Sequence, residues 1–362
     1  MATESRPHPL RRARWIWLPL AAAAGLLACG RAPGPGSARG DDRSAVLATV
    51  TMLADGAAAL LGPEVPVATL IGPGVDPHLY RPTRDDMGRL LAADLVLAVG
   101  LHLEANLEGS LERLSGEAGG RSRLWTLGAA LDPAGLLGTP VGAEGLASLD
   151  PHVWMDLPLW SAGIAALAVE LGQRRPAEAA QIAARAEGYR ARLEQLDGYL
   201  AACIDSIPPE RRVLVTAHDA FRYFGRRYGL EVRGLQGLST ESEAGLRELA
   251  ELVELLVARR IPAVFVESSV PEQGVRALIA GAAERGHAVA LGGVLYSDAT
   301  GPQGSPAGSL IGMLASNAET IARGLGGEPP AGGFAAWTAR TPSAGDAPAP
   351  RGAGIESEEE RP

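Results

Sequence analysis

Two of the six histidines in this chain of 362 residues lie in the same tripeptide, Asp-Pro-His, at positions 76–78 and 150–152. A proline forces the residue before it out of the α-helical region, so each histidine stands at a fixed point where a new element begins. Neutral imidazole is a common zinc ligand, and a ring held in one orientation binds better than a mobile one. The repeated tripeptide therefore predicts that His78 and His152 are ligands of one metal ion.

Two more residues with metal-binding side chains follow apolar stretches in the second half of the chain. His218 comes shortly after the predicted strand 213–215, and Asp298 follows the apolar residues 294–295. Open α/β sheets place their ligand sites at the carboxyl ends of strands. His218 and Asp298 are therefore predicted to complete the site, so that two ligands from each half of the chain close over an ion.

The four predicted ligands must be positioned by regions in which short apolar strands alternate with helices. In the first half, strands are expected at 46–50, 65–71 and 95–99, and helices at 52–61 and 84–92. In the second half, strands are expected at 213–215, 230–232, 263–266 and 288–291, and helices at 220–228, 243–259, 272–285 and 309–325. Continuous apolar strands that alternate with helices indicate parallel sheets covered on both faces. The predicted fold class is α/β, with two parallel-sheet lobes.

Residues 157–203 differ in composition from the regions on either side. They are rich in Ala, Leu, Glu and Arg and contain few helix-breaking residues. This composition predicts one long helix between the lobes, or two helices with a kink near Pro176, because proline lacks the backbone donor that a helix interior needs. The lobes are therefore expected to be bridged by helix, with the metal in the cleft between them.

The N-terminus has the layout of an export signal. Four arginines within residues 1–14 precede an apolar run at 15–28, which is shorter than the roughly 17–25 residues of a membrane-spanning helix. The run ends in Leu26-Leu27-Ala28-Cys29, which resembles a bacterial lipobox with cleavage before Cys29 and a lipid on its sulfur. The alternative is an ordinary cleaved signal with an incidental cysteine. Cys203, in an apolar helical context, is expected to be a buried free thiol.

These signals divide the chain into six segments. They are a signal peptide at 1–28, a lipid-anchored linker at 29–44, a first α/β lobe at 45–156, a linking helix at 157–204, a second α/β lobe at 209–326 and a tail at 327–362. The tail is rich in Pro, Gly and Ala and ends in a run of glutamates, so it is expected to be disordered.

Charge and composition narrow the classes of function. The net charge is −9 with an isoelectric point near 5.3, which argues against nucleic acid as a partner. The chain contains no lysine, which excludes a P-loop and Schiff-base chemistry on lysine.

At its histidine motifs the chain resembles the metal-binding solute receptors of bacterial zinc and manganese ABC importers, of the cluster A-I type. The resemblance runs from about residue 48 to 325 and rests on ordered phrases, among them DPHLY at 76–80, GLHLE at 100–104, DPHVWMD at 150–156, TAHDAFRYF at 216–224, GLSTESE at 237–243 and FVESSV at 265–270. It implies two lobes bridged by one long helix, and a metal held by His78, His152, His218 and Asp298. It also implies delivery of the metal to a membrane permease by an extracytoplasmic, lipid-anchored, monomeric protein.

The other two histidines of the domain, His102 and His287, are not ligand positions in that family. His102 is expected near the mouth of the cleft, and His287, before a strand, is expected to be structural. Three acids are candidates for supporting the ligands or the fold: Asp156, Asp219 and Glu267.

Zinc is the expected metal, because three imidazoles and one carboxylate suit it, whereas manganese prefers oxygen-rich sites. Members of the family have either His or Glu at the position of His218, and the imidazole here favours zinc. Zinc-specific relatives often carry a His-rich loop between the first two ligands. Residues 107–149 contain no histidine, which keeps manganese open.

Three other functions compete with metal transport. A zinc hydrolase would keep three protein ligands and an open position for water, and neither H-E-x-x-H nor G-x-S-x-G occurs in the chain. A receptor for a larger ligand, such as a metal chelate or a corrinoid, would lack converging histidines. A surface adhesin of the same fold is neither supported nor excluded by the sequence.

Overall fold

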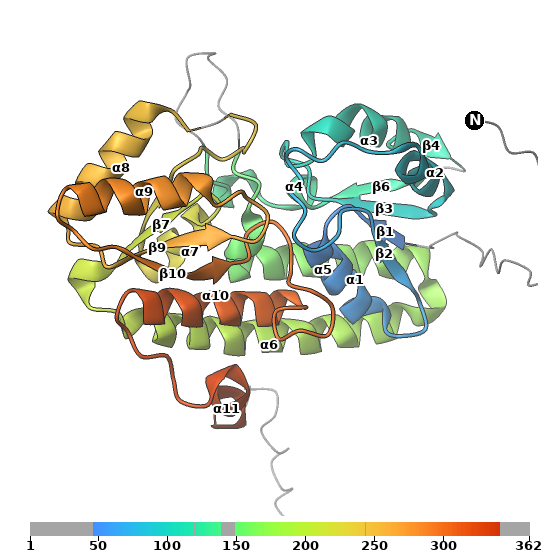
Figure 1. Ribbon diagram of the computed structural model, residues 1–362. Coiled ribbons are helices and arrows are strands. Elements are labelled where there is room, and N and C mark those ends of the chain that lie inside the picture. The colour runs from blue at the N-terminus through green and yellow to red at the C-terminus, as the bar shows by residue number, and fades with distance from the viewer. Residues whose placement is uncertain (1–45, 119–120, 139–148, 243, 341–362) are drawn as a thin grey trace, which may run out of the picture. The chain divides into compact units, whose positions relative to one another are not determined.

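The computed structural model describes residues 46–118, 121–138, 149–242 and 244–340, and these form two α/β lobes and the helices that join them (Figure 1). The predicted fold class is therefore confirmed. The predicted signal peptide at 1–28, Cys29 and the linker at 29–44 lie outside the described residues.

The first lobe is built on a parallel four-stranded sheet with the order β2-β1-β3-β6. Its strands are β1 (Val46–Ala48), β2 (Val67–Thr69), β3 (Leu95–Ala98) and β6 (Leu124–Thr126). Its helices are α1 (Thr51–Leu61), α2 (Arg84–Ala92), α3 (Glu108–Leu114) and α4 (Leu127–Ala130), and β4 (Glu117–Ala118) pairs with β5 (Arg121–Ser122) at its edge. Every residue of β1 and β3 is buried, as expected for central strands of a covered parallel sheet.

The second lobe contains two parallel strand pairs, β7 with β8 and β9 with β10, and β7 lies next to β9. The strands are β7 (Val213–Thr216), β8 (Glu231–Gly234), β9 (Ala263–Glu267) and β10 (Ala290–Leu295). The helices are α7 (Arg222–Tyr228), α8 (Leu246–Ala258), α9 (Gln273–Glu284) and α10 (Leu310–Gly324). Each element predicted in this half is present, with its ends shifted by a few residues.

The segment between the lobes is two helices, α5 (Leu157–Arg174) and α6 (Ala179–Asp205), joined by a 3₁₀ turn at Pro176–Glu178. They pack side by side, so the chain folds back at the proline instead of continuing (Figure 1). Arg175 leaves the helical region, with φ −127° and ψ 65°, as expected before a proline. Of the two arrangements expected for this segment, the structure therefore has the two helices with a break at Pro176, and not a single helix over 157–204. The helix α6 spans both lobes, since it contacts α1 on one side and α7 and α10 on the other.

The structure also corrects the predicted tail. Residues 333–340 form a helix, α11 (Gly333–Arg340), which contacts α6 and α10. The rings of Phe334 and Trp337 lie 5.4 and 5.8 Å from the ring of Tyr199 in α6. Composition predicted disorder from residue 327, but these two aromatic side chains supply apolar surface that packs on the bridging helix. Residues 341–362 lie outside the described part of the chain.

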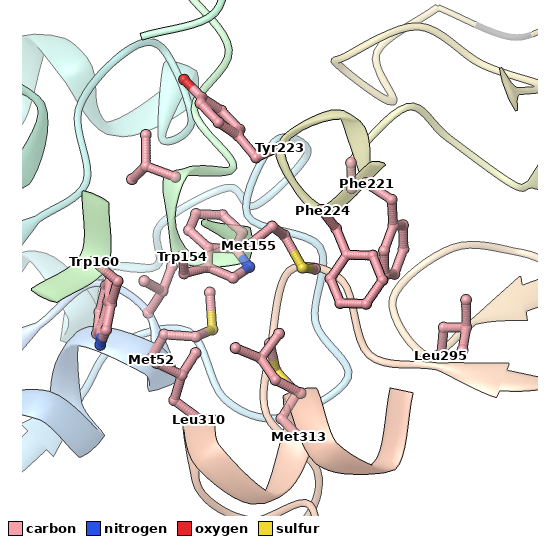
Figure 2. Packing of buried hydrophobic residues seen from close by; sticks show 14 of the residues in the cluster. Met52, Trp154, Met155, Trp160, Phe221, Tyr223, Phe224, Leu295, Leu310 and Met313 are labelled. Carbon is pink, nitrogen blue, oxygen red and sulfur yellow. The ribbon is translucent and has the colours of Figure 1, made fainter. Parts of the chain in front are cut away.

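A single cluster of buried apolar side chains extends through both lobes. Where the lobes meet, it brings together aromatic and sulfur-containing side chains from several elements (Figure 2): Met52 of α1, Trp154 and Met155 before α5, Phe224 of α7 and Met313 of α10. Cys203 is buried and unpaired, as predicted, and burial raises the pKa of its thiol to about 12.

Among the described residues, no helix combines the length and the apolar character needed to cross a bilayer.

Candidate metal centre

The structure brings the four predicted ligands together in one buried cluster. His78, His152, His218 and Asp298 each offer a ligand atom, and these atoms all lie within 4.8 Å of one another. The Nε2 atoms of His152 and His218 are 3.3 Å apart, and they lie 3.3 and 3.5 Å from the two carboxylate oxygens of Asp298. Each of the four residues is at most 2% exposed.

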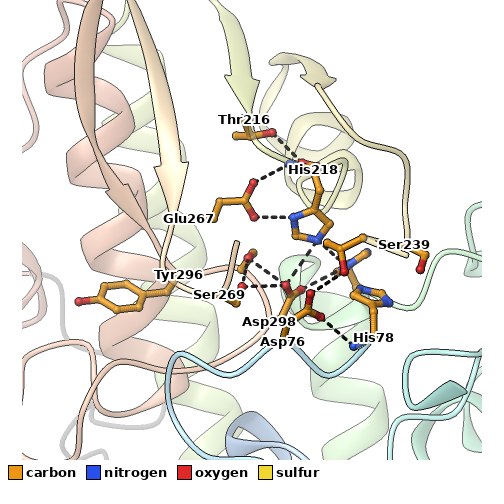
Figure 3. A network of polar contacts seen from close by, with 12 residues as sticks. Asp76, His78, Thr216, His218, Ser239, Glu267, Ser269, Tyr296 and Asp298 are labelled. Carbon is orange, nitrogen blue, oxygen red and sulfur yellow. Dashed lines mark hydrogen bonds and ion pairs between the residues drawn. The ribbon is translucent and has the colours of Figure 1, made fainter. Parts of the chain in front are cut away.

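His78 lies in the loop that follows β2, and the aspartate of its own tripeptide holds it. The backbone N–H of His78 donates to Oδ1 of Asp76 at 2.8 Å (Figure 3). The carbonyl oxygen of His78 accepts a hydrogen bond from the amide of Asn106 at 3.2 Å. The Nε2 atom of His78 is buried and has no hydrogen-bond partner among the described residues.

The second tripeptide repeats the first local geometry. The backbone N–H of His152 donates to Oδ1 of Asp150 at 3.0 Å, which is the turn that an aspartate makes with the backbone two residues later. The same oxygen lies 2.8 Å from Nδ1 of the His152 ring. A carboxylate on Nδ1 places the proton there and leaves Nε2 free to bind a metal. The aspartate of each Asp-Pro-His motif therefore orients its histidine.

His218 stands just beyond the carboxyl end of β7, and its support comes from the end of the neighbouring strand β9. Glu267, the last residue of β9, accepts the backbone N–H of His218 at 2.8 Å through Oε1 (Figure 3). Its other oxygen lies 2.7 Å from Nδ1 of the same histidine. One buried glutamate thus holds both the backbone and the ring of the ligand.

Asp298 follows β10, and two hydroxyl groups fix one of its oxygens. Oδ2 accepts from Ser269 at 2.9 Å and from Ser297 at 3.2 Å. Oδ1 is buried and accepts no hydrogen bond within the described part of the chain. Like Nε2 of His78, it is a buried polar atom without a hydrogen bond among the described residues, as expected of atoms that bind a cation, although Nε2 of His152 lies 3.3 Å from it.

Burial and charge act in opposite directions on the ionisable groups of the cluster. Burial would lower the pKa of His152, but Asp150 and Asp298 outweigh it and raise this pKa to about 9. Glu267 and Asp298 likewise raise the pKa of His218 well above its usual value, against the effect of burial. Burial would raise the pKa of Asp298, but the two histidines hold it well below the usual range. Burial lowers the pKa of His78 to about 3.

The donor set fits a divalent transition metal. Three imidazole nitrogens and one carboxylate oxygen are the number and type of ligands that zinc takes in a tetrahedral site. Polar groups behind the cluster hold the side chains of His152, His218 and Asp298 and the backbone of His78, so the arrangement can enclose an ion. An ion bound by all four side chains would have no open position for the water that a catalytic zinc binds.

The other residues considered from the sequence lie outside the cluster. His102 is exposed and pairs with Glu108 at 2.6 Å, and Nε2 of His287 lies 2.8 Å from the carbonyl oxygen of Ile261. Of the three candidate acids, Glu267 supports a ligand directly. Asp219 lies 3.7 Å from Arg222, and burial raises its pKa to about 6. Asp156 caps α5.

Sequence reasoning gave no role to four residues that position the ligands: Asp76, Asp150, Ser269 and Ser297. The signal for the two aspartates was present, because each stands two residues before a predicted ligand in the repeated tripeptide. The two serines carried no such signal, since Ser269 reaches Asp298 only through the pairing of β9 with β10.

Comparison with known proteins agrees with this geometry. Residues 46–324 match the family described as "Zinc-uptake complex component A periplasmic". The chain belongs to this family. It is therefore related to solute-binding components of transport systems, and the resemblance inferred from the motifs is confirmed.

Individual relatives of this zinc-uptake component family cover most of the chain. The chain is 42% identical over 285 residues to the manganese-binding lipoprotein MntA of Bacillus subtilis, covering 79% of this chain and 90% of that one. The structure of the periplasmic zinc-binding protein TroA from Treponema pallidum superimposes with a TM-score of 0.73 at 40% identity, covering 78% of this chain and 99% of that one. The manganese ABC transporter substrate-binding lipoprotein PsaA of Streptococcus pneumoniae is 26% identical over 301 residues, which is 83% of this chain and 94% of PsaA.

Proposed function

We propose that this protein captures a divalent transition metal with His78, His152, His218 and Asp298 and delivers it to a membrane ABC importer. The observation that carries the proposal is the convergence of four buried ligand atoms within 4.8 Å, of which two are polar atoms without a hydrogen-bond partner. Membership of a family of uptake components, and the name of the relative PsaA, support delivery to a transporter.

The metal is zinc in this proposal, with manganese as the alternative. Three nitrogen donors favour zinc, because manganese prefers a site with more oxygen donors. The relatives include proteins named for each metal, MntA for manganese and TroA for zinc. The donor set of this chain is therefore the observation on which the preference for zinc depends.

Metal analysis of the purified protein, followed by competitive titration with zinc and manganese, tests the proposal. His218→Ala should lower the zinc affinity by far more than about 100-fold, the upper range for losing a group that only supports a ligand. His287→Ala is the matched control, because His287 lies in the same lobe and contacts a backbone carbonyl outside the cluster. Wild-type zinc affinity in His218→Ala would show that His218 is not a ligand.

A binding protein fits the site better than an enzyme does. The four ligands fill a tetrahedral coordination sphere, and a zinc hydrolase would need an open position for water. Zinc-loaded protein is therefore expected to show no hydrolysis of ester or peptide substrates. The surface adhesin remains a second role of the same fold that no described residue favours.

We further propose that the mature protein begins at Cys29 and is held by a lipid on the extracytoplasmic side of the membrane, as a monomer that does not bind nucleic acid. The charged N-terminal segment, the apolar run and the lipobox-like end of that run support the anchor, and two of the relatives are named lipoproteins. Cys29→Ser should release the protein from the membrane fraction. An intact mass with an unmodified Cys29 in the native protein would contradict the anchor.

A further inference from the structure

Two metal-ligand segments are hydrogen-bonded by side chains from the opposite half of the molecule. Trp154 lies just before α5, which packs against α1 and α4 of the first lobe, and its indole Nε1–H donates to the carbonyl oxygen of Ser297 at 2.8 Å. Ser297 directly precedes the ligand Asp298 in the second lobe. The contact therefore fixes the peptide group that enters Asp298.

The reverse contact comes from the second lobe. Thr240, in the segment between β8 and α8, donates its hydroxyl to Oδ2 of Asp76 at 2.5 Å. The other oxygen of Asp76 accepts the backbone N–H of His78. One carboxylate thus joins a ligand of the first lobe to a hydroxyl group of the second.

Both contacts are suited to hold the site closed. Trp154 is 0% exposed and Thr240 is 7% exposed. If either hydrogen bond breaks, water therefore cannot readily take the place of the lost partner. A buried indole N–H or carboxylate oxygen that loses its partner destabilises the arrangement by more than the net value of the bond. The ring of Trp154 also lies 5.4 Å from the ring of His152, edge to face, so this one side chain contacts the segments of two ligands.

We infer that Trp154 and Thr240 are positioning residues that slow the release of the metal, because each holds a ligand segment of the opposite lobe, Trp154 that of Asp298 and Thr240 that of His78. The inference rests on the proposed function, because it assigns a kinetic role within the same site. Each lobe positions a ligand of the other lobe. When these contacts break, Asp298 and His78 should therefore both lose their alignment. Neither residue binds the metal itself.

Matched pairs of variants separate this role from a purely structural one. Trp154→Phe keeps an aromatic ring and removes the N–H donor. Trp160→Phe makes the same change at another fully buried tryptophan, which packs against Gly56 in the contact of α5 with α1. Thr240→Val removes the hydroxyl group at nearly constant shape, whereas Thr240→Ser retains it.

The experiment loads each full-length variant with zinc and follows zinc transfer to excess EDTA by stopped flow, beside the thermal midpoint of the metal-free protein. Trp154→Phe and Thr240→Val should release zinc roughly 3- to 10-fold faster than wild type, the effect of about one net hydrogen bond. Trp160→Phe and Thr240→Ser should stay within about twofold, since each keeps the contacts of the cleft. A structural role alone would lower the midpoints of both tryptophan variants without separating their release rates.

Equal release from Trp154→Phe and Trp160→Phe would overturn the role of Trp154, and equal release from Thr240→Val and Thr240→Ser would overturn that of Thr240. If Trp154→Phe does not fold, the threonine pair decides whether the opposite lobe positions a ligand. Failure of wild type and Trp160→Phe to bind zinc at all would instead contradict the proposed function.

Discussion

The supports of the three histidines differ, and this difference determines how protons compete with the metal. His152 and His218 each have a carboxylate within 2.8 Å of Nδ1, whereas Nε2 of His78 is buried without a partner. These carboxylates raise the pKa of His152 to about 9 and that of His218 well above its usual value, whereas burial lowers the pKa of His78 to about 3. Protons therefore compete with a metal for His152 and His218 more strongly than for His78.

The pH dependence of zinc binding follows from these directions. The pKa of His152 is raised to about 9 and that of His218 is raised well above its usual value, so protons oppose the metal until the pH exceeds both. Affinity should rise with pH from about 6.5 towards 9, by up to about 100-fold per pH unit for two displaced protons. Calorimetry in buffers of different ionisation enthalpy should show that zinc binding at pH 7 releases protons. A flat affinity between pH 6 and 8 would contradict a site with three histidines.

Metal selectivity is the second property that belongs to single residues. His218→Glu should retain binding but shift the preference towards manganese, because a second carboxylate makes the site harder. Glu267 lies 2.7 Å from Nδ1 of His218 and would face the new carboxylate, so the affinity for both metals should fall as well. Competitive titration of this variant beside wild type measures the ratio of the two affinities. An unchanged ratio would show that residue 218 does not determine the metal.

At the scale of elements, the N-terminal end of α5 connects the His152 segment to the rest of the fold. Asp156 caps this helix by accepting the backbone N–H of Leu159 at 3.2 Å, and its other oxygen lies 3.0 Å from Arg226 of α7. The cap follows the Asp-Pro-His motif of His152 by only a few residues, so it sets where the ligand segment ends and the helix begins.

Asp156→Ala should therefore lower the free energy of unfolding by about 1–2 kcal/mol, the range for losing a helix N-cap. Asp156→Asn retains an oxygen that can cap the helix and removes only the charge beside Arg226. It should therefore lower the free energy of unfolding by less than Asp156→Ala does. Urea denaturation of the metal-free proteins measures the free energy of unfolding of both variants. If the two variants lose equal stability, the ion pair with Arg226 and not the cap is the important contact.

At the scale of the whole molecule, α6 is the element that joins the lobes. It is a continuous helix of 27 residues, and it contacts α1 of the first lobe as well as α7 and α10 of the second. Bending it would break backbone hydrogen bonds in its interior. Movement on metal binding is therefore expected to be local, in the loops that carry the ligands, with the segment around Asp298 moving most.

Solution scattering tests this expectation. The radius of gyration should change little when zinc is added to the metal-free protein, while amide hydrogen exchange in the loops that follow β2 and β10 should slow. Movement confined to these loops leaves α6 unchanged, so the bridging helix should show the same exchange in both states. A large decrease in the radius of gyration would instead indicate closure of the lobes about a hinge.

The sequence by itself determined the alternation of strands and helices, and with it the two lobes. It also predicted the four residues that the structure brings together, because each follows a strand or repeats the Asp-Pro-His motif. These features are local, because apolar strands, helix-breaking prolines and short motifs can each be recognised within a few consecutive residues. The same reasoning placed a break near Pro176, where the 3₁₀ turn lies.

Only the tertiary structure decided how distant segments meet. The antiparallel packing of α5 on α6 depends on apolar faces that become neighbours only after the chain turns back, and the ordered helix α11 depends on Tyr199 as a packing partner. The contacts of Trp154 with Ser297 and of Thr240 with Asp76 join residues that are 143 and 164 positions apart. No periodicity in the sequence records such a distance, because one hydrogen bond between two lobes leaves no repeated pattern in either segment.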